Sequence, residues 1–212
     1  GIDDKSMDIA ALKEGAQDYL IKGHFNANLL IRSIYYSIER HKMYVALRSM
    51  ALIDELTGLY NRRGFNNLAH NHIELAKRKK RSILLLYCDL DNFKRVNDDH
   101  GHGVGDEALR TVGTLLKEIF RESDIIARRG GDEFIILTFD VLEEDKETIV
   151  RRLHNKLNEY NDTHNNNYML SMSVGAKYYD YQELTSIESL LEDVDRLMYI
   201  EKKRKDCKNS LK

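Results

Sequence analysis

The sequence predicts an α+β fold in which helices surround one sheet, and three observations lead to that prediction. Apolar runs of strand length occur at 82–90 and 168–179, and two shorter runs flank a glycine-containing turn in 125–137. Segments with helical spacing of apolar residues separate these runs. The resulting order, with two strands flanking a central hairpin and helices between them, is typical of an α+β sheet covered by helices.

The length and composition fit one ordinary domain with an appendage. The chain has 212 residues, a net charge of -2 and 42% hydrophobic residues. Two cysteines, Cys88 and Cys207, are too few for a disulfide framework, so we expect a reduced, cytoplasmic setting. We expect no membrane segment, because no apolar stretch approaches about 20 residues. The mixed charge also gives no reason to expect a nucleic-acid partner.

A long helix is predicted near the N-terminus. Residues 8–23 read as a helix, a short strand and a turn, but 26–54 contain neither glycine nor proline. Apolar residues recur there at roughly helical spacing: Leu29, Leu30, Ile34, Ile38, Val45 and Leu52. A helix of this length often pairs with a partner, although packing on its own domain is the alternative.

The remaining elements follow in order. The segment DELTGLYNRRGF breaks the long helix at Thr57-Gly58, and a second helix is predicted from about Arg63 to Lys80. After the buried strand SILLLYCDL we expect a loop and then a helix to about Phe120. The later elements are a hairpin with strands at 124–129 and 133–139, a helix at 143–161, a strand at 168–179 and a helix at 187–203, followed by a frayed basic tail.

Two acidic pairs stand at strand ends. Asp89 and Asp91 close the buried strand, and their side chains share one side because strand side chains alternate. Such a pair suits Mg²⁺, although a simple strand cap is the alternative. Asp132 and Glu133 follow two glycines, and their mutual repulsion favours a bound cation. Alone, that turn would read as an exposed hairpin. If the two strands are neighbours, three or four carboxylates converge and fit one or two Mg²⁺ ions with a nucleoside triphosphate.

The loop between these acidic pairs offers groups for a nucleotide. Lys94 suits a phosphate, and Asn97 can both donate and accept hydrogen bonds. Asp106 can accept from the two N–H donors on the guanine edge, which favours guanine over adenine.

These motifs together resemble the GGDEF family of diguanylate cyclases. RRGGDEF, DLDNFKRVNDDHGHGVGDEAL and DELTGLYNRRGF occur in the family's order, and the resemblance covers about Leu52 to Lys203. It implies a sheet like the palm of nucleotide polymerases and class III adenylyl cyclases. It also implies an enzyme that condenses two GTP into cyclic di-GMP, releases pyrophosphate, uses Mg²⁺ or Mn²⁺, with two ions per active site, and works as a homodimer.

The resemblance assigns roles to residues at matching positions. The expected metal ligands are Asp89, the backbone carbonyl of Leu90, Asp132 and Glu133, and the expected catalytic residues are Asp132, Glu133 and Lys94. The expected substrate-binding residues are Phe93, Asn97, His102, Asp106, Gly130, Gly131 and Lys202. Arg121 and Asp124 form an R-x-x-D sequence at the family's product-inhibition position; a surface ion pair is the alternative.

Two positions depart from the family pattern. Arg129 replaces a residue that is often aromatic, which should not abolish activity. The C-terminal EKKRKDCKN lacks the family's glycine-arginine pair, so the second phosphate contact is Lys205, Lys208 or missing.

The N-terminal ALKEGAQDYLIKG resembles the end of a response-regulator receiver domain, with Lys22 after its last strand. We therefore predict a receiver remnant at 1–25, a linking and dimerisation helix at 26–53, and a cyclase domain at 54–212 that serves as the output of a two-component regulator. Two alternatives remain: a catalytically weak relative that only binds nucleotide, and another Mg²⁺-dependent nucleotidyl enzyme on a related fold.

Overall fold

The computed structural model describes residues 26–50, 52–164 and 167–209, which fall into two compact units, Gly1–Ala51 and Leu52–Lys212. In the first unit the described residues form helix α2, Ala27–Met50. The predicted long helix is therefore present but ends earlier, and Ile53 instead forms a bridge with Tyr60. The predicted receiver remnant, with Lys22, lies outside the described residues. None of the described helices is long and apolar enough to cross a membrane.

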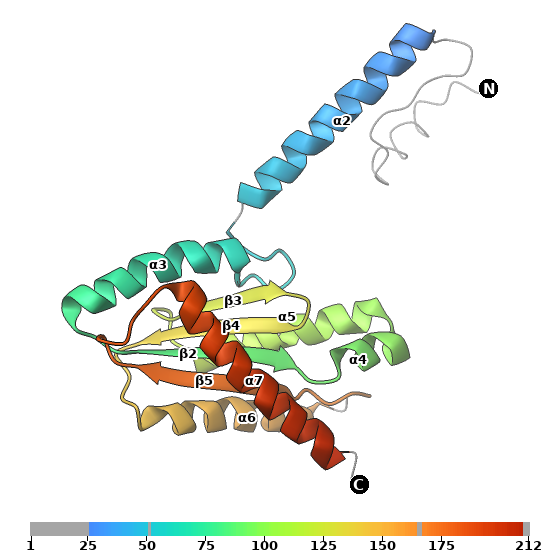
Figure 1. The fold of residues 1–212 in the computed structure, drawn as a ribbon. Coiled ribbons are helices and arrows are strands. Elements are labelled where there is room, and N and C mark those ends of the chain that lie inside the picture. The colour runs from blue at the N-terminus through green and yellow to red at the C-terminus, as the bar shows by residue number, and fades with distance from the viewer. Residues whose placement is uncertain (1–25, 51, 165–166, 210–212) are drawn as a thin grey trace. The chain divides into compact units, whose positions relative to one another are not determined.

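A mixed sheet forms the centre of the second unit, with the strand order β1-β3-β4-β2-β5 (Figure 1). The β1–β3 pair is parallel and the other pairs are antiparallel. The bounds are β1 Tyr60–Asn61, β2 Ile83–Leu90, β3 Ile125–Gly130, β4 Glu133–Phe139 and β5 Met172–Tyr179. The predicted hairpin is β3–β4, and the sheet with surrounding helices confirms the α+β class.

Helices cover both faces of the sheet and give two apolar cores. Helices α3 (Arg62–Lys79) and α7 (Ile187–Asn209) pack on one face, and α5 (His102–Ile119) and α6 (Asp145–Thr163) on the other. Every residue of β2 is buried, and alternate side chains enter opposite cores: Leu84, Leu86 and Cys88 one, Ile83, Leu85 and Tyr87 the other. Because both faces are covered, β2 is a continuous apolar run, as predicted.

Helix α7 crosses the sheet very close to β5, and Figure 1 shows it lying across the face of the strands. A Cβ atom at Gly175 would lie 2.0 Å from the backbone oxygen of Val194, so only glycine fits there. This close approach brings the C-terminal part of α7 over the end of β2.

Three elements differ from the prediction. The segment predicted as a loop after β2 is mostly helix α4, Phe93–His100, and Gly101 (φ 84°) separates it from α5. Only Val96 is buried in α4, so no apolar periodicity marks the helix. The short strand β1 was not predicted. The basic tail predicted to fray continues α7 to Asn209, because lysines in it pair with carboxylates at the end of β2.

Candidate active site

The end of β2 and the β3–β4 turn bring three acidic residues together. Asp89 and Glu133 are directly opposite each other in the β2–β4 ladder, so their side chains lie on the same face of the sheet. The N–H of Leu90 donates to the backbone oxygen of Asp132 at 3.1 Å, which ties the strand end to the turn. The two acidic motifs therefore lie on neighbouring strands, which is the arrangement that the convergence of their carboxylates requires.

Arg128 holds the turn that carries Asp132. Its Nε donates to the Gly131 oxygen at 2.8 Å, and its Nη1 donates to both oxygens of Asp54 at 3.2 and 3.3 Å. Gly131 has φ 55°, a left-handed conformation that favours glycine. Sequence reasoning missed Arg128, because its partner Asp54 is 74 residues away and no local pattern links them.

Asp89 is buried and already pairs with a cation. Its side chain is 9% exposed, and Lys202 Nζ on α7 lies 2.6 Å from its Oδ1. Burial raises the pKa of Asp89 and the Asp132 charge adds to this, although the Lys202 hydrogen bond opposes it. Burial lowers the pKa of Lys202, but its contact with Asp89 outweighs this and leaves the pKa raised.

Glu133 belongs to a second network on the same face. The Tyr87 hydroxyl hydrogen-bonds with Glu133. Burial is the largest cause of the raised pKa of Tyr87, and the Glu133 charge raises it further. Arg129 Nη1 donates to the Tyr87 hydroxyl at 3.3 Å, and its guanidinium lies 5.5 Å from the centre of the Tyr87 ring. Arg129, which departs from the family pattern, therefore adds a positive charge beside the acidic site.

Asp91 is anchored to the protein. It accepts hydrogen bonds from Ser171 and Ser173 at 2.6 Å and from Lys205 at 2.9 Å. Burial favours its neutral form, but these hydrogen bonds hold the pKa of Asp91 below its ordinary value. Lys205 also donates to the Met172 oxygen at 2.6 Å. Both Asp91 and Lys205 thus have partners that favour a structural role.

The donor set fits a hard divalent cation, but the side chains are not gathered around one point. Among the described residues, no three acidic, histidine or cysteine side chains are arranged to hold a metal ion. Instead, Lys202 hydrogen-bonds with Asp89, and Tyr87 hydrogen-bonds with Glu133. Carboxylate oxygens are the ligands that Mg²⁺ prefers, and a cationic group already occupies Asp89. The predicted ligands Asp89, Leu90, Asp132 and Glu133 are therefore neighbours whose metal role stays a prediction.

The predicted nucleotide residues lie on α4 and at the start of α5. Lys94, His102 and Asp106 are exposed, whereas Phe93 and Asn97 are partly buried. Because His102 and Asp106 are four residues apart on α5, they share one helix face.

Gly105, one of three glycines noted in this part of the sequence but given no role of its own, lies where α4 packs against α5. A Cβ atom there would lie 1.9 Å from Asn97 Oδ1 and 3.3 Å from the ring of Phe93. The missing side chain lets α4 approach α5, which brings Asn97 next to the turn of α5 that carries Asp106. The three glycines in HGHGVGD were the available sequence signal.

The R-x-x-D sequence forms a tight turn before β3. The backbone N–H of Arg121 donates to Asp124 Oδ2 at 2.9 Å. Among the described residues, no direct ion pair joins the Arg121 side chain to Asp124, although the Arg121 charge still acts on that carboxyl. The inhibition role of these two residues stays a prediction. Cavities of about 400 and 170 Å³ flank this turn, and Arg152 of α6 lines the smaller one. Burial raises the pKa of Asp124, although Arg121 and Arg152 oppose it.

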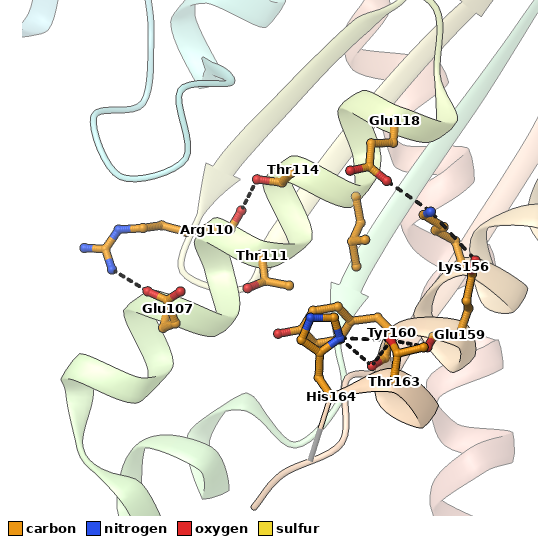
Figure 2. Close-up of a pocket in the computed structure, with 11 residues that line it drawn as sticks. Glu107, Arg110, Thr111, Thr114, Glu118, Lys156, Glu159, Tyr160, Thr163 and His164 are labelled. Carbon is orange, nitrogen blue, oxygen red and sulfur yellow. Dashed lines mark hydrogen bonds and ion pairs between the residues drawn. The ribbon is translucent and has the colours of Figure 1, made fainter. Parts of the chain in front are cut away.

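A further cavity of about 590 Å³ lies between α5 and α6 (Figure 2). Lys156 reaches across it to Glu118, and the rings of Tyr160 and His164 stack with centres 4.1 Å apart. It contains none of the predicted catalytic, metal or nucleotide residues.

Comparisons with known proteins show the family of the chain. The family model described as diguanylate cyclase, GGDEF domain, matches residues 51–208. The chain is 31% identical over 170 residues to the Cyclic di-GMP phosphodiesterase NbdA of Pseudomonas aeruginosa, covering 80% of this chain and 21% of NbdA. It is 34% identical over 157 residues to the Probable diguanylate cyclase DgcC of Escherichia coli, covering 74% of this chain and 42% of DgcC. The chain thus spans less than half the length of these two relatives.

A solved structure has a similar fold. The GGDEF domain of DgcB from Caulobacter crescentus, in complex with c-di-GMP, superposes with a TM-score of 0.66 and is 25% identical. The match covers 72% of this chain and 91% of that domain.

Proposed function

The chain belongs to the diguanylate cyclase GGDEF family, and we propose from this premise that it condenses two GTP molecules into cyclic di-GMP with release of pyrophosphate. The observation that carries the proposal is the position of Asp89 opposite Glu133, with Asp132 on the glycine turn beside them. Acidic side chains from two adjacent strands there share one face with Lys202.

The residues proposed to hold divalent cations are Asp89, the carbonyl of Leu90, Asp132 and Glu133. One or two bound Mg²⁺ or Mn²⁺ ions would neutralise triphosphate charge and lower the pKa of the attacking 3′-hydroxyl. The DgcC name, a probable diguanylate cyclase, supports this reaction for the proposed site.

The protein's own groups have distinct proposed tasks. Asn97 and Asp106 bind the guanine edge, with Phe93 and His102 beside the base. Lys94 and Lys202 bind phosphate oxygens, and Gly130 and Gly131 let the backbone lie close to them. Asp132 accepts the proton of the 3′-hydroxyl as that oxygen bonds to the α-phosphorus of the other GTP. The bond from this phosphorus to pyrophosphate then breaks.

Catalysis by this scheme needs two chains, because each domain holds one GTP and two must meet. Ile31, Ile34 and Ile38 of α2 are 65%, 51% and 49% exposed, and their spacing of three and four residues makes an apolar stripe. Such a stripe fits a second copy of α2 in a coiled coil. We therefore propose that α2 brings two cyclase domains together.

We propose two kinds of regulation, one by the product and one by a receiver domain. Cyclic di-GMP binds Arg121 and Asp124 as an inhibitor, and Arg152 is a further candidate for this site because it lines the adjacent cavity. The resemblance at 1–25 supports a response-regulator output domain working in the cytoplasm.

A nucleotide-binding module without turnover is the second candidate function. The observation in its favour is that one relative, NbdA, is named as a phosphodiesterase and not as a cyclase. The chain matches only 21% of NbdA. A different nucleotidyl enzyme that uses ATP is disfavoured by Asp106 and Asn97, which suit guanine.

Incubation with GTP and Mg²⁺, followed by mass spectrometry, tests the proposal. We expect cyclic di-GMP from the native protein and none from Asp132→Ala or Glu133→Gln, whereas Glu159→Gln on α6 should leave the product unchanged. Binding of GTP without product would support the second candidate. Arg121→Ala should relieve product inhibition without lowering the initial rate.

A further inference from the structure

We propose that Lys202 is the resident cation of the metal-free acidic site, and that it exchanges Asp89 for a nucleotide phosphate when a divalent ion enters. This inference rests on the proposed function and adds a coupling between metal and nucleotide binding. Its starting observation is the 2.6 Å contact between Lys202 Nζ and Asp89 Oδ1.

The ammonium and a divalent ion compete for one place. Asp89 is 6% exposed, and its carboxylate is approached by Lys202 from α7 while Glu133 stands opposite on β4. A Mg²⁺ ion lies about 2.1 Å from a carboxylate oxygen, so an ion on either oxygen of Asp89 would be only a few ångströms from Lys202 Nζ. Repulsion between two cations at that range in a partly buried site is strong. The lysine therefore has to leave when the ion binds.

Lys202 is free to move while its helix is held. One turn further along α7, Lys205 donates to both Asp91 and the Met172 oxygen, and its side chain is 28% exposed. Among the residues that the structure describes, Lys202 hydrogen-bonds only with Asp89, and its side chain is 37% exposed. The fixed Lys205 thus keeps the stem of Lys202 beside the acidic site, where its flexible side chain can swing between anions.

The exchange makes the two ligands cooperative. An ion that enters alone displaces Lys202 and leaves the ammonium without an anionic partner. An ion that enters with a triphosphate provides a phosphate oxygen for the displaced ammonium. Each ligand therefore strengthens binding of the other, and the coupling is reciprocal. Removal of Lys202 should strengthen binding of the ion alone and weaken this coupling.

The test measures Mn²⁺ binding by electron paramagnetic resonance, with and without 3′-deoxy-GTP, which lacks the attacking hydroxyl. No turnover is needed. Lys202→Met should bind Mn²⁺ alone roughly three- to tenfold more tightly than the native protein, the size expected for a half-exposed competing cation. The factor by which 3′-deoxy-GTP tightens Mn²⁺ binding should be smaller in the variant.

The matched control is Lys203→Met, which removes the same charge from the neighbouring residue. Lys203 is exposed, and its Nζ lies 4.5 Å from the centre of the Tyr199 ring, so we expect less than about a twofold change. Lys202→Gln provides a second variant, and thermal unfolding shows that each variant is folded.

Three results overturn the inference. The first is unchanged or weaker Mn²⁺ binding in Lys202→Met and Lys202→Gln while Asp89→Asn still abolishes the site. That result contradicts the exchange but not the metal site. An equal gain in Lys203→Met shows a general charge effect. Mn²⁺ binding that survives Asp89→Asn contradicts the metal site itself, and thus also this part of the proposed function.

Discussion

Arg128→Ala is expected to loosen the β3–β4 turn and destabilise the domain. The guanidinium connects the Gly131 oxygen, next to Asp132, with Asp54 at the start of the domain. Its side chain is 14% exposed and that of Asp54 is 22% exposed, so the pair is largely shielded from water. The alanine variant removes three hydrogen bonds and leaves the Asp54 carboxylate partly buried.

The expected loss in unfolding free energy is about 2–3 kcal/mol. Removing one partner of a fully buried ion pair costs about 3–5 kcal/mol. The cost is smaller here, because Asp54 keeps hydrogen bonds from the N–H and hydroxyl of Thr57 at 2.9 and 2.7 Å. In a domain of this size, such a loss lowers the melting temperature by about 5–10 °C. Cyclase activity should fall further than the folded fraction, because the turn carrying Asp132 loses its hydrogen bond.

Urea unfolding and circular dichroism measure this effect. The matched control is Arg95→Ala, which breaks an ion pair whose arginine is 81% exposed and should cost less than about 0.5 kcal/mol. A loss of the same size in both variants would show that the Arg128 contacts contribute nothing special.

The pH dependence provides a second check. Burial opposes ionisation of Asp54, but hydrogen bonds from Thr57 and the charge of Arg128 hold its pKa below 3.8. The resulting stability is present above the unfolded pKa and is lost as the pH falls through the lower folded pKa. The difference between native protein and Arg128→Ala should therefore stay constant between pH 7 and about pH 5, and shrink as the pH falls from there to pH 3. A difference that stays constant down to pH 3 would refute the reasoning.

Three further substitutions test the packing around the site. Gly105→Ala should displace Asn97, since the new Cβ would lie 1.9 Å from its Oδ1, and lower GTP affinity roughly tenfold in a folded protein; unchanged affinity in a titration would contradict the guanine site. Lys205→Met should cost about 1–3 kcal/mol and speed hydrogen exchange in the last turns of α7, and unchanged exchange would mean that the Lys205 contacts do not hold the helix. Gly175→Ala would place a Cβ 2.0 Å from the Val194 oxygen, so we expect a loss of several kcal/mol in urea unfolding; native-like stability would show that α7 can shift freely.

Local patterns in the sequence were enough to predict the main elements. The apolar run of β2 and the glycine turn between β3 and β4 are formed by residues that are adjacent in the sequence. A local pattern is therefore sufficient to predict them. The family motifs predicted metal roles for the acidic residues and nucleotide roles for residues of α4 and α5. Helix α4 escaped prediction because a short amphipathic helix with one buried residue, Val96, has no apolar period to detect.

The sequence by itself determined the α+β class, the hairpin turn and the set of candidate site residues. The tertiary structure decided which charges meet: Lys202 with Asp89, Lys205 with Asp91, and Arg128 with Asp54. These partners are 113, 114 and 74 residues apart. Periodicity reports only which side of an element is buried, whereas an ion pair depends on how distant elements pack. The sequence of the basic tail therefore predicted fraying, whereas in the structure the tail forms the last turns of α7.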